Sequence, residues 1–139
     1  MDAPESPPGA TPPRQADGGS AAVANTMVWT WKDINVVLVP LVGQRGVAAL
    51  YNRSLYLTAK AFPWLTIVPA DIEAPIDLDA LEALLNQQGV AAATEGSAAL
   101  LRTFHKLIST LIGQSLTERL LLPVWEKYSI ASPAQEPLP

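Results

Sequence analysis

Large apolar residues recur at helical spacing along most of the chain. In the segment 31–41 they follow the i, i+3, i+7, i+10 spacing of one helix face. These positions are Trp31, Ile34, Leu38 and Leu41. Three valines in the same segment would suit a strand equally well. A wider apolar stripe crosses 100–112, so a helix there must be largely buried.

The residues between these stripes carry signals that begin and end helices. Segment 61–76 contains three prolines, which predicts a loop pinned at the surface. Asp77 can cap the next helix with its carboxylate, and Gly89 stands where a left-handed residue would end that helix. Residues 90–96 are small and predict weak structure. The predicted helices cover 31–41, 47–60, 78–88 and 100–112, and a last one starts at residue 116.

Two segments of the chain share a pattern at an offset of 70 residues. Gly43 and Gly113 are the centres of this pattern. It places Leu41-Val42-Gly43-Gln44 over Leu111-Ile112-Gly113-Gln114. The shared corner favours helix over strand for segment 31–41. It predicts an all-α fold, a small bundle of about five helices, in which two helix–corner–helix units close on each other about a pseudo-twofold axis. Chance similarity in a leucine-rich chain is the alternative.

Composition divides the chain into three parts. Residues 1–26 are rich in proline, glycine and alanine and have few large apolar side chains, so we expect a disordered tail. Residues 131–139 hold three prolines and predict a second disordered tail. The remaining segment 27–130 is long enough to bury an ordinary hydrophobic core without disulfides or metals. We therefore expect one helical domain between two tails.

The charged residues and the missing cysteines narrow the function. The chain has 13 acidic and 9 basic residues, a net charge of −4, which argues against nucleic-acid binding. It has no cysteine and one histidine, so thiolate and His-rich metal sites are not expected. Its apolar runs are shorter than the ~18 residues of a membrane span, and no signal peptide is recognisable at the start. We expect a cytoplasmic protein without a membrane span, cofactor or metal.

The only histidine allows one specific alternative. The segment Phe104-His105-Lys106-Leu107-Ile108-Ser109-Thr110 resembles the phospho-acceptor helix of bacterial histidine kinases. This resemblance implies a histidine phosphotransfer protein that uses His105. Lys106 stands where that family has an acidic residue, and the Thr-Pro step and an ATP-binding domain are missing. The other interpretation is a histidine at the edge of the buried stripe.

Aromatic residues outside the stripes predict where a partner could bind. Loop 62–68 is apolar for a loop, so it either folds back over the bundle as a lid or meets a partner. Aromatic residues and arginine are typical of interface centres. The candidate contact residues are Phe62, Trp64, Leu65 and Trp125, with Arg45 and Arg53 as a polar rim.

One longer string bears on function. Segment 111–121 reads Leu-Ile-Gly-Gln-Ser-Leu-Thr-Glu-Arg-Leu-Leu and resembles a helical corner of small bacterial signalling-associated proteins. No phosphate-binding loop and no Gly-x-Ser-x-Gly motif occurs, so we do not expect an enzyme. We expect a protein-interaction module, a signalling accessory or adaptor that can form a homodimer through its apolar faces. The alternatives are phosphotransfer through His105 and a sensor that holds a small apolar ligand between the two units.

Overall fold

The computed structural model describes residues 14–68 and 74–130, with side chains from residue 19 on. These residues form helices and contain no strand. The elements are α1 (Arg14–Thr58), the short 3-10 helix η3 (Pro63–Leu65), α2 (Leu78–Asn86), α3 (Val90–Ile112) and α4 (Gln114–Lys127). The predicted all-α fold is confirmed. The predicted tail 131–139 and the first 13 residues lie outside the described part.

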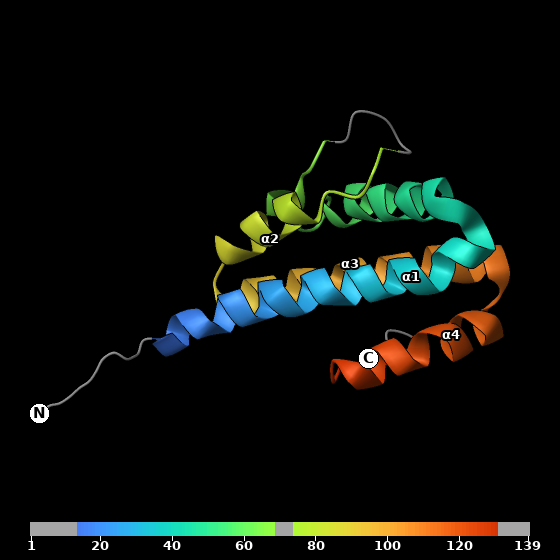
Figure 1. The fold of residues 1–139 in the computed structure, drawn as a ribbon. Helices are drawn as coiled ribbons and strands as arrows, with labels where there is room; N and C mark the ends of the chain where they lie inside the picture. Colours follow the sequence, from blue (N-terminus) through green and yellow to red (C-terminus); the bar gives the residue numbers. More distant parts are fainter. Residues whose placement is uncertain (1–13, 69–73, 131–139) are drawn as a thin grey trace, which may run out of the picture.

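The chain turns back twice at the same end of the bundle (Figure 1). The first turn is within α1, at Gly43, and divides this helix into a first limb, residues 14–42, and a second limb, residues 44–58. The second turn is at Gly113, between α3 and α4. The first limb and α3 run side by side in the same direction, with the second limb and α4 on opposite sides of this pair.

Both turns have the same backbone conformation. Gly43 has φ 81° and ψ 162°, and Gly113 has φ 95° and ψ 148°. Only glycine adopts this region of the φ/ψ map without strain, because it has no Cβ atom. The two helices predicted on either side of Gly43 are therefore joined in one element, α1, whose backbone is not helical at that residue.

The buried positions of the two corners also coincide at the offset of 70 residues. Pairs in which both side chains are buried include Trp31 and Leu101, Ile34 and Phe104, Leu38 and Ile108, Val47 and Thr117, Tyr51 and Leu121, and Leu55 and Trp125. These pairs lie on both sides of each corner. The first limb thus buries the face that α3 buries, and the second limb the face that α4 buries.

Two side-chain hydrogen bonds repeat the same relation across the bundle. Thr58 donates to the hydroxyl of Thr103 at 3.3 Å, which joins the second limb to α3. Tyr128 donates to the Asp33 carboxylate at 2.7 Å, which joins the end of α4 to the first limb. The two bonds correspond at the offset of 70 residues, because Tyr128 is the counterpart of Thr58 and Asp33 is the counterpart of Thr103. Reciprocal contacts of this kind characterise interfaces with twofold symmetry.

The core is built around three aromatic rings. Trp31 makes edge contacts with Tyr51 and with Phe104, each with ring centroids 4.9 Å apart. All three side chains are buried, so the first limb, the second limb and α3 meet at this cluster. Such edge-to-face pairs contribute about 0.5–1.5 kcal/mol beyond the burial of their surface.

The domain starts earlier than predicted. α1 begins at Arg14, so residues 14–26 are helical and not part of a disordered tail. Ala24 and Met27 are buried in the core. Near its start the helix lies so close to α3 that a Cβ on Gly19 would overlap Val90. Small residues in this segment therefore permit close packing, which a search for large apolar residues does not detect.

The structure also revises the start of α3. This helix begins at Val90 and includes the segment 90–96 that we expected to be weakly structured. Gly89 has φ −71° and ψ 165°, so it is extended and precedes α3 instead of ending α2 in a left-handed conformation. The predicted cap of α2 is confirmed, because the Asp77 carboxylate accepts a hydrogen bond from the Ala80 amide at 3.0 Å.

Replacement of either corner glycine should destabilise the fold. We expect Gly43→Ala and Gly113→Ala each to lower the free energy of unfolding by about 1–3 kcal/mol, because alanine is strained at these angles. Urea unfolding followed by circular dichroism measures the effect. Gly89→Ala is the control, since its φ is negative and no atom lies within 4 Å of the added Cβ. Equal stability of all three variants would contradict the proposed constraint.

Asp33 should make the free energy of unfolding depend on pH below neutrality. Hydrogen bonds from Lys127 and then from Tyr128 hold the pKa of the Asp33 carboxyl below its ordinary value. The charged carboxylate therefore stabilises the fold above its ordinary pKa, and this contribution is lost as the pH falls through the lowered pKa of the folded state. Unfolding midpoints should fall less between pH 7 and pH 3 in Asp33→Asn than in the wild type. Glu126→Gln, an exposed α4 carboxylate, is the control, and identical pH profiles for Asp33→Asn and wild type would refute the assignment.

Candidate functional site

The apolar loop 62–68 packs mostly within the domain. Leu65 is fully buried, and Phe62 and Trp64 are half-buried with their rings 6.4 Å apart. The Trp64 ring lies against Gly96 of α3, where a Cβ would be 2.6 Å from the ring. Of the two predicted alternatives, the structure shows the loop folded back on the bundle, with Val68 exposed at its end.

The other predicted contact residues do not join this loop in one surface. Trp125 of α4 is 2% exposed and belongs to the core, as does Leu65. A side chain that is buried in its own domain offers no surface to a partner. Arg45 and Arg53 are exposed on the second limb of α1. Large apolar side chains predicted an interface here. Because Leu65 and Trp125 are buried, they are removed from the candidate contact residues.

His105 lies on the buried side of α3. Its side chain is 5% exposed, and its Nδ1 atom lies 3.5 Å from the Ser109 hydroxyl one turn later. A phospho-acceptor nitrogen must be reached in line by a phosphoryl donor. The packed environment of His105 leaves no room for such an approach in this conformation.

An exposed apolar stripe runs along the outside of the first limb of α1. We call it the outward stripe, and it consists of Ala22, Trp29, Val36 and Pro40. Trp29 is 49% exposed and Val36 is 70% exposed. Lys32 lies beside the stripe, with its ammonium 4.6 Å from the centre of the Trp29 ring. The seven-residue spacing of Trp29 and Val36 could have revealed this face, but the stripe predicted in this segment ran through Trp31, Ile34, Leu38 and Leu41 instead.

This limb belongs to a helix that is both long and apolar. By length and composition, the stretch Gly19–Thr58 of α1 could cross a membrane, but the chain reverses direction within it at Gly43. Only 28% of its most apolar window is buried inside the fold. A core helix of a soluble protein passes the same test when it is mostly buried. The exposed large apolar side chains of α1 are Trp29, Val36, Leu41 and Tyr56.

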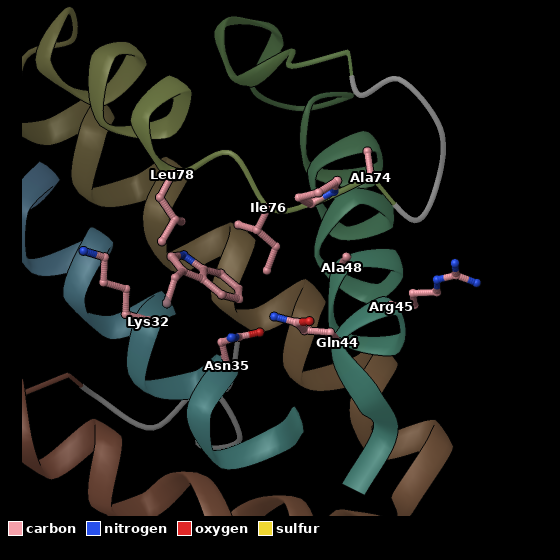
Figure 2. Close-up of a pocket in the computed structure, with 10 residues that line it drawn as sticks. Lys32, Asn35, Gln44, Arg45, Ala48, Ala74, Ile76 and Leu78 are labelled. Atoms are coloured by element: carbon pink, nitrogen blue, oxygen red, sulfur yellow. The ribbon is translucent and has the colours of Figure 1, made fainter. Parts of the chain in front are cut away.

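A pocket of about 810 Å³ lies between the two limbs of α1 and the segment that precedes α2. Figure 2 shows Gln44 pointing from the second limb toward the first, with Asn35 opposite. Ile76, in the segment before α2, and Leu78, the first residue of α2, point toward the first limb. The lining residues are Trp31, Lys32, Asn35, Gln44, Arg45, Ala48, Ala74, Pro75, Ile76 and Leu78.

Two buried polar atoms of the aromatic cluster have no hydrogen-bond partner in the described structure. They are Nε1 of Trp31, which lines the pocket, and the hydroxyl of Tyr51. Burial, and then the negative charge of Asp77, raise the pKa of Tyr51, so its hydroxyl stays protonated. A buried donor without a partner costs about 1–3 kcal/mol. The pocket wall therefore includes a buried N–H donor, Nε1 of Trp31, whose hydrogen bond no described residue accepts.

Among the described residues, no group of His, Asp or Glu side chains is arranged to hold a metal ion. Compared with known protein families, curated proteins and solved structures, the chain has no match. The outward stripe and the pocket are therefore interpreted from their own geometry.

Gly96→Ala should displace the Trp64 ring of loop 62–68 from α3. The added Cβ would lie 2.6 Å from the Trp64 ring, so the ring must move toward solvent. We expect a loss of about 1–3 kcal/mol in the free energy of unfolding and a red shift of tryptophan emission. The emission shift should vanish in a Trp64→Phe background, which assigns it to this ring. Gly89→Ala is the matched control, and unchanged emission in Gly96→Ala would show that Trp64 does not rest on Gly96.

Proposed function

We propose that the protein is a non-catalytic, cytoplasmic interaction module of the signalling adaptor kind, and that it binds a protein partner through the outward stripe of α1. The observation that carries the proposal is the exposure of Trp29 and Val36 two helical turns apart on one face. Large exposed apolar residues on one helix face are typical of helix-binding surfaces. Tryptophan contributes strongly to such interfaces because it removes a large apolar area from water.

The charges around the stripe favour a protein over a membrane as its partner. Lys32 and Asp33 lie between Trp29 and Val36 in the sequence, and the Lys32 ammonium lies beside the stripe, against the Trp29 ring. Charged side chains are costly in a bilayer interior, but they fit the polar rim of a protein interface. The net charge of −4 also disfavours binding to anionic lipid surfaces.

We further infer that the chain consists of two helix–corner–helix units. Support comes from the matching angles of Gly43 and Gly113 and from the buried positions that coincide at the offset of 70. The reciprocal Thr58–Thr103 and Tyr128–Asp33 bonds support the same inference. Counting the two limbs of α1 as separate helices supports the expected bundle of about five helices. In this arrangement the units bury their apolar faces against each other, so self-association is not needed to cover them.

The two alternative functions are less well supported. Phosphotransfer requires an accessible histidine, and His105 is buried. A sensor for a purely apolar ligand requires an apolar cavity between the two units. The described pocket lies instead within the first unit and has Lys32 and Arg45 at its edge.

Site-specific cross-linking tests the interaction surface. With a photoreactive amino acid at position 36 of the full chain in the source cell, we expect a discrete cross-linked protein, because Val36 is 70% exposed. The same label at position 53 is the control, since Arg53 is also exposed but lies on the other limb. With the purified partner, Trp29→Gln combined with Val36→Gln should weaken binding about tenfold or more.

Three results would decide against a separate protein partner. Equal cross-linking from positions 36 and 53 would show that the stripe is not the interface. Flotation of the purified chain with lipid vesicles, abolished by the double stripe variant, would assign the stripe to a membrane. A concentration-dependent dimer in sedimentation, abolished by the same variant, would assign it to a second copy of the chain.

A further inference from the structure

The pocket between the limbs of α1 has the chemistry of a ligand site distinct from the outward stripe. Its volume of about 810 Å³ falls within the usual range for small-molecule sites, about 300–1,000 Å³. One part of the wall is apolar and comes from Trp31, Ile76 and Leu78. The other part carries two cationic and two amide side chains, and none of the described residues that line the pocket is acidic.

The polar side chains of the pocket are available for a ligand. Within the described residues, Asn35, Gln44 and Arg45 make no side-chain hydrogen bond or ion pair with another residue. Figure 2 shows the Asn35 and Gln44 amides facing each other in the pocket, and the charged ends of Lys32 and Arg45 pointing away from it on opposite sides. Both cationic side chains are exposed, so they can turn toward the pocket without breaking an ion pair. Lys32 would give up its contact with the Trp29 ring when it does so.

The corresponding positions of the second unit show what is special about the first. Gln114, the counterpart of Gln44, donates to the Glu118 carboxylate at 2.8 Å. The counterpart of Glu118 in the first unit is Ala48, which lines the pocket. Ala48 neither accepts the Gln44 amide nor brings a negative charge into the pocket. The glutamine amide at the corner therefore has an acceptor within the second unit, whereas in the first unit it is free to donate to an anionic ligand.

We propose that this pocket binds a small amphiphile with an oxyanion head, a carboxylate or phosphate, joined to an apolar body. The head would lie against Arg45, Lys32 and the Gln44 amide, because guanidinium and ammonium groups and N–H donors bind oxyanions with charge-assisted hydrogen bonds. The apolar body would lie against Trp31, Ile76 and Leu78 and gain the free energy of removing that surface from water.

Titration with four ten-carbon probes tests the charge and the head group. Decanoate, decyl phosphate, decylammonium and decanol are titrated into the full chain and followed by the side-chain amide signals of Asn35 and Gln44. We expect saturable 1:1 binding of an anionic probe, about tenfold tighter than decylammonium or decanol. The stronger of decanoate and decyl phosphate identifies the head. Equal binding of all four probes would overturn the proposal, as would unchanged amide signals.

Variants of the lining residues test the location. Ala48→Glu gives the first unit the residue of the second and should weaken binding of the anionic probe about tenfold. Because Ala48 is nearly buried, Arg45→Gln combined with Lys32→Gln is the second test, and both of these residues are exposed, so folding should be kept. Arg53→Gln removes a cation from the same limb outside the pocket and should bind like the wild type. An equal loss in Arg53→Gln, or no loss in the Arg45 and Lys32 double variant, would overturn the assignment.

The same titration separates the pocket from the outward stripe. The Trp29→Gln and Val36→Gln double variant should keep its affinity for the anionic probe, since neither residue lines the pocket. If that variant loses the probe, the probe binds the stripe and the pocket proposal fails. The interaction proposed for the stripe would stand or fall separately, on cross-linking.

Discussion

The crossed packing of the two corners is the constraint on which the rest of the structure depends. A hydrogen bond from Thr58 to Thr103 joins the second limb of α1 to α3. A hydrogen bond from Tyr128 to Asp33 joins the end of α4 to the first limb. At the centre, Trp31 contacts Phe104 from α3. Each corner therefore completes its core with side chains of the other. Because both chain reversals depend on glycine angles that other residues adopt only with strain, the crossed arrangement is set by two residues, Gly43 and Gly113.

The features that the sequence predicted correctly are those with a local physical cause. The apolar stripes of 31–41 and 100–112 predicted helices because burial requires one continuous face. Asp77 predicted a cap because a carboxylate at that position satisfies a free backbone amide. The Leu-aliphatic-Gly-Gln corner placed both chain reversals, because glycine is the residue that such a turn requires.

The features that the sequence did not predict depend on contacts between distant segments. Residues 14–26 and 90–96 are rich in alanine and glycine, which indicated loose structure, yet these small residues let α1 and α3 approach closely and let Trp64 rest on Gly96. The prediction of Leu65 and Trp125 as partner contacts failed for a similar reason. Leu65 and Trp125 were chosen for size, but size alone does not distinguish an interface from a core. Only the fold shows that these two are buried and that Trp29 and Val36 are exposed.

The differences between the two proposed units are more informative about function than their likeness. Where the units agree, as at Leu38 and Ile108, the shared property is burial, and packing explains it. Where they differ at exposed or lining positions, packing is no explanation. Trp29 stands outward where the second unit has Ala99, and Ala48 leaves a pocket amide open where Glu118 closes it. Both differences lie where we propose binding. Packing two similar halves against each other would require neither difference, so both binding proposals concern the first unit.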